Sequence, residues 1–285
     1  MISPKPLPLA KPRAYRPRRE PVTIAIGWAY DGGLLFCADT GVTGLIKQNQ
    51  SKIVRHVSND GNCVMVFASS AVDLNFPLSA ISKCWEAVEG MDFTVRSLEE
   101  VHHAAEFSLA EFYSTHIYPH PDREPNSLYL QLLVGIWLRG TARLYLSNET
   151  VLNAVNQYEC IGAGAYLAKY LIGLYRKANP GANSLQDAAL ISNHAVQAAI
   201  DYDARCGGKP EWLIIANNDS PNQASDEIGY LGEMFIDVSL ELYWKMVRDL
   251  ANMSKKDQWG KPCGERIDLL SKQLRDLDTS SKWGF

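Results

Sequence analysis

The sequence lacks any long hydrophobic run, and its two densest apolar segments, 128–138 and 166–175, are both interrupted by polar residues. A membrane-spanning helix needs about 20 consecutive apolar residues, so no such helix is expected. The N-terminus also lacks the apolar stretch of a secretory signal, and its prolines break any amphipathic transit helix. These absences predict no membrane partner and no export.

Paired cysteines are also missing, because the six cysteines are scattered and form no CxxC motif. This distribution predicts reduced thiols and a cytoplasmic location, and it argues against a disulfide framework. Without paired cysteines, and with Pro119 between His116 and His120, the histidines are not aligned as ligands of a metal ion. The sequence therefore predicts no metal site, and His102 and His116 are interpreted as packing or surface residues.

A third absence concerns cofactors. The segment Gly162-Ala163-Gly164 follows a predicted strand and opens a predicted helix, but it lacks the third glycine of a dinucleotide fingerprint. No βαβ pattern surrounds it, so we interpret it as a tight turn from strand to helix. The sequence accordingly predicts no cofactor.

Net positive charge is confined to the first 22 residues. That arm holds six basic side chains, one acidic side chain and six of the 14 prolines, for a net charge of +5. The whole chain carries a net charge of −4, so the remaining residues carry −9. A basic, proline-rich arm thus precedes an acidic body, which excludes a uniformly basic nucleic-acid binder, and the arm is expected to be poorly ordered.

The apolar patterning of the body comes in blocks of strands and helices. A capping box of Ser97 and Glu100 marks the start of one helix. The blocks predict an α+β protein with two helical layers rather than alternating βαβ units. Strands are expected at 23–30, 34–38, 52–57, 63–68, 128–138, 142–146, 158–161 and 211–216, and helices at 72–88, 97–112, 164–177, 184–205 and 238–251, with a further amphipathic stretch at 267–277.

Two carboxylates stand where an anion is costly. Asp39 ends the apolar strand 34–38, and a carboxylate at the end of a buried strand needs a cation or several hydrogen-bond donors. Asp203 continues an apolar stripe to the end of its predicted helix, where the helix dipole disfavours an anion. Each is therefore either a member of a site or a structural cap.

Four segments in order resemble the start of proteasome β-type subunits, which are N-terminal-nucleophile hydrolases. They are 23–27 (TIAIG), 31–40 (DGGLLFCADT), 51–53 (SKI) and 66–70 (VFASS), and the later segments 161–165 and 203–208 extend the likeness to about residue 217. The resemblance implies a four-layer αββα sandwich.

The resemblance also implies a site, residue by residue. Thr23 matches the catalytic threonine, Asp39 the aspartate that orients a lysine, Lys52 that lysine, and Asp203 a second supporting aspartate. Lys47 is a weaker alternative for the lysine, because the loop before Lys52 is a few residues short. The backbone N–H of Ser69 matches the oxyanion donor, while Ala163 and Cys206 stand where the family commonly has supporting serines.

Thr23 departs from the family in one respect, because the mechanism needs a free amine on the nucleophile. Residues 1–22 precede it, and Val22 stands where self-cleaving members have glycine. A branched residue crowds the twisted peptide that self-cleavage requires. Because GTG can encode valine and also start translation in bacteria, one hypothesis places the true start at position 22, with methionine removal exposing Thr23.

Together these features predict a threonine-type endopeptidase, with peptides or proteins as substrates and no bound cofactor. The alternatives are a catalytically inactive, proteasome-like scaffold subunit and a small-molecule amidase. The resemblance further implies a homo-oligomeric ring and an ATP-dependent unfoldase as partner. The expected organisation is an arm at 1–22 (a pro-segment or a misassigned start), a hydrolase domain at 23–253 and a polar extension with a short helix at 254–285.

Overall fold

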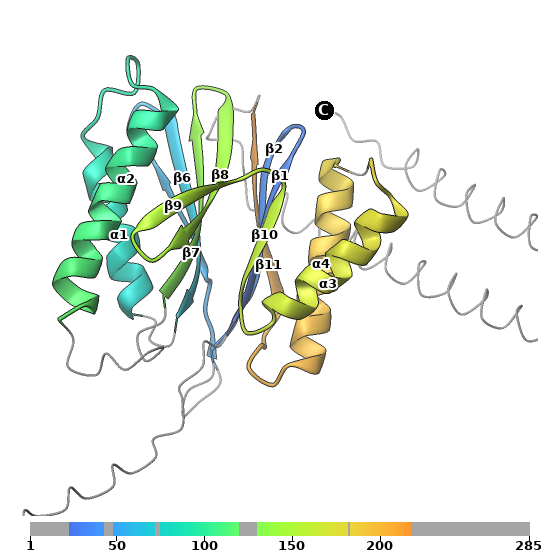
Figure 1. The fold of residues 1–285 in the computed structure, drawn as a ribbon. Helices are drawn as coiled ribbons and strands as arrows, with labels where there is room; N and C mark the ends of the chain where they lie inside the picture. Colours follow the sequence, from blue (N-terminus) through green and yellow to red (C-terminus); the bar gives the residue numbers. More distant parts are fainter. Residues whose placement is uncertain (1–22, 43–47, 72–74, 120–129, 182, 218–285) are drawn as a thin grey trace, which may run out of the picture.

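The computed structural model of the chain describes residues 23–42, 48–71, 75–119, 130–181 and 183–217. These residues form four layers (Figure 1). Helices α1 (Asn75–Glu89) and α2 (Leu98–Phe112) form one outer layer, and α3 (Ala165–Ala178) and α4 (Leu185–Tyr202) form the other. Two antiparallel sheets lie between them, which confirms the expected α+β sandwich.

The sheet next to α3 and α4 has the strand order β10-β1-β2-β11, and the sheet next to α1 and α2 has the order β5-β6-β7-β8-β9. A two-stranded ribbon, β3 (Gly41–Val42) with β4 (Gln48–Asn49), stands apart from both. The strands of the first sheet are β1 (Ile24–Tyr30), β2 (Gly33–Asp39), β10 (Tyr158–Gly162) and β11 (Pro210–Ala216). Those of the second are β5 (Ile53–Val57), β6 (Cys63–Ala71), β7 (Leu130–Leu138), β8 (Thr141–Asn148) and β9 (Val151–Val155).

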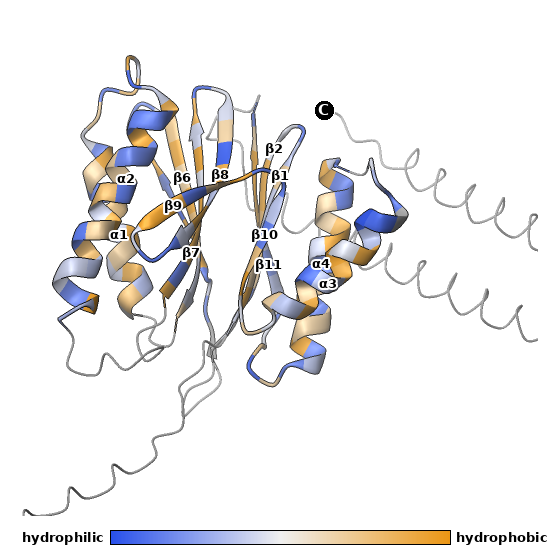
Figure 2. Cartoon of the chain, viewed as in Figure 1, coloured by the Kyte–Doolittle hydropathy of each residue, from blue (hydrophilic) through white to orange (hydrophobic). Residues whose placement is uncertain are grey.

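Strand β6 shows how the layers are held together. Successive side chains of a strand point to opposite faces, and β6 is buried along its whole length. Cys63, Met65 and Phe67 pack with the residues of α1 and α2. The alternate residues Val64 and Val66 pack against the other sheet. Apolar colour accordingly runs through the interior layers and the inner faces of the helices (Figure 2).

The structure differs from the sequence-based elements at several places, and the ribbon of β3 and β4 was not predicted. Strand β9 was not predicted; it is an edge strand of which only Leu152 is buried, so its apolar alternation is weak. Helix α2 continues into a π-helical turn, Tyr113–Ile117. Helix α4 ends at Tyr202 and not at 205, because Asp203 adopts an extended backbone conformation.

Several expectations lie outside the described residues: the arm 1–22, the helix 238–251, the stretch 267–277 and the extension 254–285. Lys47 and His120 lie outside them as well. Within the described ranges, no helix combines the length and the apolar character that crossing a membrane requires. The described cysteines, Cys37, Cys63, Cys84, Cys160 and Cys206, are all buried and unpaired.

The geometry of the candidate site depends on a close approach between two backbone segments. The segment after α4 runs against the end of β2, where the Gly41 amide donates a hydrogen bond to the Gly207 carbonyl oxygen at 2.7 Å. A Cβ atom on Gly41 would lie 2.3 Å from the Gly207 carbonyl carbon. Only glycine at position 41 therefore lets the two segments meet this closely.

Candidate active site

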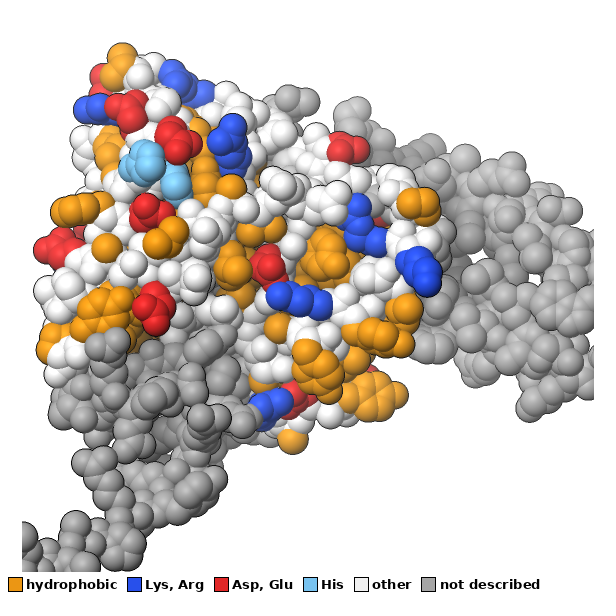
Figure 3. Space-filling view, viewed as in Figure 1, with side chains coloured by type: hydrophobic (Ala, Val, Ile, Leu, Met, Phe, Trp, Pro, Cys, Tyr) orange, Lys and Arg blue, Asp and Glu red, His pale blue; other side chains and the backbone are white. Residues whose placement is uncertain are grey.

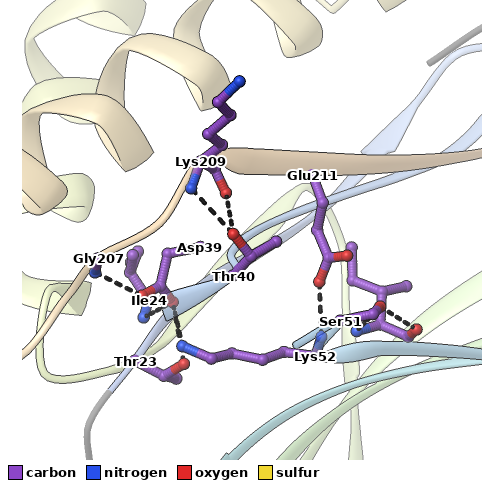
Figure 4. Close-up of polar contacts among 10 residues, drawn as sticks. Thr23, Ile24, Asp39, Thr40, Ser51, Lys52, Gly207, Lys209 and Glu211 are labelled. Atoms are coloured by element: carbon purple, nitrogen blue, oxygen red, sulfur yellow. Dashed lines mark hydrogen bonds and ion pairs between the residues drawn. The ribbon is translucent and has the colours of Figure 1, made fainter. Parts of the chain in front are cut away.

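Asp39 is the centre of a buried polar cluster at the end of β2 (Figure 4). Its side chain is fully buried, and its Oδ1 accepts hydrogen bonds from the Thr23 hydroxyl at 3.0 Å and from the Ile24 amide at 2.9 Å. The same oxygen lies 2.7 Å from Lys52 Nζ. Its Oδ2 accepts from the Gly207 amide at 2.9 Å. The expectation that Asp39 needs a cation or several donors is confirmed, since it has both.

Lys52 brings the second sheet into the cluster. It precedes β5, and its side chain reaches across to the carboxylate of Asp39 on the first sheet (Figure 4). Lys52 is 4% exposed. Burial lowers the pKa of Lys52, and the negative charge of Asp39 opposes that shift. The predicted trio of Thr23, Asp39 and Lys52 therefore converges within hydrogen-bond distance where the two sheets meet.

Glu211 is a site residue that the sequence interpretation missed. It lies on β11 opposite Ala38 of β2, and its Oε1 accepts a hydrogen bond from the main-chain amide of Lys52 at 2.6 Å. Burial raises the pKa of Glu211, while hydrogen bonds from Lys52, Ser51 and the Ile53 amide oppose the rise. A glutamate inside the apolar segment 211–216 is the signal that marks it in the sequence.

We expect Glu211→Gln to raise the stability of the protein at pH 7 and Glu211→Ala to lower it. Because the folded-state pKa of Glu211 is raised, the folded protein binds this proton more tightly than the unfolded chain, and stability falls as pH rises from about 4.5 through the folded pKa. The glutamine variant keeps an acceptor without the charge, so it should be more stable than the parent at pH 7 and lose that advantage in acid. The alanine variant leaves the Lys52 amide without its acceptor and should lose about 1–3 kcal/mol of stability.

Urea unfolding of both variants and the parent protein at pH 4 and pH 7 measures these differences. An equal loss of stability in the two variants at both pH values would show that the carboxylate charge has no part in the effect.

Asp203 lies next to the cluster but does not join Thr23. It is the C-cap of α4, and its carboxylate accepts from the Arg205 amide at 3.0 Å and from the Arg205 guanidinium at 2.9 and 2.8 Å. Arg205 holds the pKa of Asp203 below its usual range. The expected partner is thus present. Asp203 lies at the end of its helix as expected, but the helix does not continue to 205, because an aspartate that binds the following backbone competes with the helix. Among the described residues, the contacts of the Asp203 carboxylate are with Arg205, and no hydrogen bond joins it to Thr23.

The comparisons with known proteins agree on one architecture. No family model matches the chain. Over 151 residues, or 53% of the chain, it is 29% identical to proteasome subunit beta 1 of Hyperthermus butylicus, and the match covers 69% of that protein. Anbu (ancestral beta-subunit) from Yersinia bercovieri superposes with a TM-score of 0.60 at 16% identity, covering 84% of this chain and 99% of that one. Anbu from Pseudomonas aeruginosa, described as a helical assembly, gives a TM-score of 0.56 at 13% identity, covering 79% of this chain and 96% of that one.

The chain has a proteasome-like fold. The structural neighbours establish the sandwich, and the partial sequence match supports the resemblance to β-type subunits. In this fold the turn from β10 to α3 packs against the candidate nucleophile. Gly162 has a φ of +92°, and a Cβ atom there would lie 2.3 Å from the Thr23 carbonyl oxygen. The Gly164 amide donates to that oxygen at 3.3 Å, so the glycine turn fixes the backbone of Thr23.

The two positions that match supporting serines by resemblance, Ala163 and Cys206, differ in the polarity of their side chains. Ala163 lies in the glycine turn and has no polar group. Cys206 is buried, and burial, together with the negative charges of Asp39 and Asp203, raises the pKa of its thiol to about 12. Cys206 is therefore a neutral thiol beside the cluster and not a competing nucleophile.

The Ser69 amide, matched by resemblance to the oxyanion donor, lies on β6. It donates to the carbonyl oxygen of Lys52 at 3.3 Å, which is long for an N–H···O hydrogen bond. An oxyanion at this place would have to share or displace that bond.

Proposed function

We propose that this chain hydrolyses amide bonds of peptides, with Thr23 as an N-terminal nucleophile once the residues before it are absent. The observation that carries the proposal is the buried cluster in which Thr23 Oγ1 and Lys52 Nζ share one oxygen of Asp39. The resemblance of the same three positions to β-type subunits, and the proteasome-like fold around them, support it.

The chemistry assigns a role to each group. A free α-amine on Thr23 takes the proton of its own hydroxyl, and the oxygen attacks the substrate carbonyl carbon. The tetrahedral intermediate then breaks its C–N bond, the amine half of the substrate leaves with that proton, and the acyl half stays as an ester on Thr23 Oγ1. Water hydrolyses this ester, which releases the acid half and restores the hydroxyl. The Lys52 ammonium lowers the pKa of the α-amine and so favours its neutral, basic form. Asp39 holds the ammonium in place and compensates its buried charge.

The second candidate function is a non-catalytic, proteasome-like subunit. One observation favours it: the Ser69 amide already donates to Lys52, and the Thr23 hydroxyl donates to Asp39, so the cluster is satisfied as a structural ion network. The third alternative, a small-molecule amidase, has no specific observation in its favour.

The decisive experiment compares two forms of the protein. One begins at Thr23, and the other keeps residues 1–22. Each is treated with a threonine-directed covalent inhibitor and its intact mass is measured. We expect the first form to gain one inhibitor and the second to gain none. Thr23→Ser, which keeps a hydroxyl and an amine, should react, whereas Thr23→Ala should not.

A form beginning at Thr23 that is folded but unreactive would support the structural candidate instead. Labelling that persists in Thr23→Ala would show that another residue is the nucleophile. Acyl-amide substrates tested beside peptides separate the small-molecule alternative, which predicts turnover of the former only.

We further propose that copies of the chain assemble into a homo-oligomer. The support is the helical assembly described for the Pseudomonas aeruginosa protein of the same fold. Light scattering of the purified full chain tests this, and a monomer mass at all concentrations would contradict it. The ring geometry and the unfoldase partner stay predictions of the resemblance.

A further inference from the structure

Three potential metal ligands gather on α2, in the outer layer away from the Thr23 cluster. Glu99, His102 and His103 are spaced i, i+3 and i+4, which places them on one face of the helix. One ligand atom from each lies within 4.8 Å of the others. Figure 3 shows histidines beside acidic side chains on this part of the surface. The cluster therefore combines two imidazoles and a carboxylate at an accessible place.

His102 is held in one tautomer by a strand of the neighbouring sheet. Its Nε2 lies 3.0 Å from the carbonyl oxygen of Leu152 on β9. A carbonyl oxygen only accepts hydrogen bonds, so Nε2 carries a proton, and Nδ1 is the ring nitrogen that can bind a cation. The ring also stacks on Tyr145, with 4.4 Å between the ring centroids. This is how metal-binding histidines are commonly oriented, with the second ring nitrogen donating to a carbonyl.

The other ring nitrogen of His102, Nδ1, has no hydrogen-bond partner. His102 is 8% exposed, and Nδ1 is buried without a hydrogen bond. It faces the carboxylate of Glu99, with 3.8 Å between Nδ1 and Oε1. A positive charge between this nitrogen and the carboxylate, either a proton on Nδ1 or a metal ion, offsets the repulsion between them. The pair thus marks a place for a positive charge.

His103 supplies the third ligand at a matching distance. Its Nε2 lies 3.3 Å from Oε1 of Glu99. Neighbouring ligand atoms around tetrahedral zinc, with bonds of about 2.0–2.2 Å, are about 3.3–3.5 Å apart. All three ligand atoms lie within 4.8 Å of one another, so binding of an ion requires the two exposed side chains, Glu99 and His103, to move toward His102. Arg143, whose Nη1 lies 4.0 Å from the other oxygen of Glu99, and Glu106, 3.7 Å from His102 Nε2, are the flanking charges.

We propose that Glu99, His102 and His103 bind one divalent transition-metal ion, with Zn²⁺ as the best match to their nitrogen and oxygen ligands, and with water at the remaining position. The ion would cross-link side chains in the first turns of α2. Because the ring of His102 contacts β9, it would also stabilise the packing of that helix on the strand. This site is independent of the Thr23 cluster, so it stands or falls separately from the proposed function.

Calorimetric titration of the full chain with ZnCl₂ tests the proposal. We expect one Zn²⁺ per chain, and at least a tenfold weaker affinity in His103→Ala and in Glu99→Gln, both of which change exposed side chains. His116→Ala is the matched control, because His116 is an exposed histidine in the turn that continues α2. The affinity of this variant for Zn²⁺ should equal that of the parent.

Titration with Co²⁺ separates this site from zinc capture by cysteines, since thiolate ligands give a charge-transfer band that imidazole and carboxylate do not. We expect the bound Co²⁺ to give a spectrum without that band. In His103→Ala we expect the spectrum of bound Co²⁺ to be lost. Absence of binding in the parent, equal affinity in His103→Ala and the parent, or a thiolate band would each overturn the proposal.

Discussion

Asp39→Ala is expected to destabilise the protein by about 3–5 kcal/mol and to abolish labelling by a threonine-directed inhibitor. The loss is large because Asp39 is fully buried and removing it leaves the Lys52 ammonium without a counter-charge. The amides of Ile24 and Gly207 lose their acceptor at the same time. Urea unfolding measures the change. Asp201→Ala, on the exposed side of α4, is the control and should stay within about 0.5 kcal/mol of the parent.

A double-mutant cycle separates the ion pair from the other contacts of Asp39. Asp39→Asn keeps the shape of the side chain but leaves Lys52 buried and charged. Adding Lys52→Met removes that charge, so the double variant should be more stable than the sum of the two single changes predicts, by about 0.5–3 kcal/mol. Strict additivity would show that the buried pair contributes no coupling, and it would contradict the cluster as described.

Lys52→Met is expected to slow inhibitor labelling of the form beginning at Thr23 by about 10²–10⁴-fold. The 2.7 Å pair with Asp39 places the ammonium beside Thr23, where under the proposed mechanism it lowers the pKa of the α-amine. Without that charge the amine titrates at higher pH, so the pH at half-maximal labelling should also rise. This shift distinguishes a role in proton transfer from a loss of packing, because methionine fills a similar volume.

Lys209→Met is the matched control for this experiment. Lys209 lies near the cluster, where its backbone contacts Thr40, but its side chain is exposed and points away from Asp39 (Figure 4). The labelling rate and the pH profile of Lys209→Met should match those of the parent. A pH profile in Lys52→Met that is unchanged, even with a slower rate, would contradict the proposed effect of the ammonium on the amine.

The strand and helix blocks followed from local patterns and were largely correct. The capping box at Ser97 forms as expected, with reciprocal bonds to Glu100, because both partners lie within one turn of the chain. Edge strand β9 was missed because it buries a single side chain, so its pairing with β8 depends on the partner strand and not on its own pattern. The end of α4 was misplaced because the carboxylate of Asp203 accepts a hydrogen bond from the Arg205 amide, two residues further along the chain.

The candidate site was predictable only as far as a resemblance reached. Thr23, Asp39 and Lys52 were named from matching positions, and the structure places them in contact. Glu211 was missed because its bond to the Lys52 amide joins two segments that are 159 residues apart. No local pattern records such a pairing.

The sequence by itself determined that the chain folds into α+β blocks with a buried strand ending in a carboxylate, because apolar periodicity and the cost of burying charge are local properties. Only the tertiary structure decided that Glu211 accepts from the Lys52 amide and that Nδ1 of His102 faces Glu99. Both depend on contacts between sheets or between a helix and a distant strand. Such contacts are set by the packing of whole layers, so they exist only once the chain has folded.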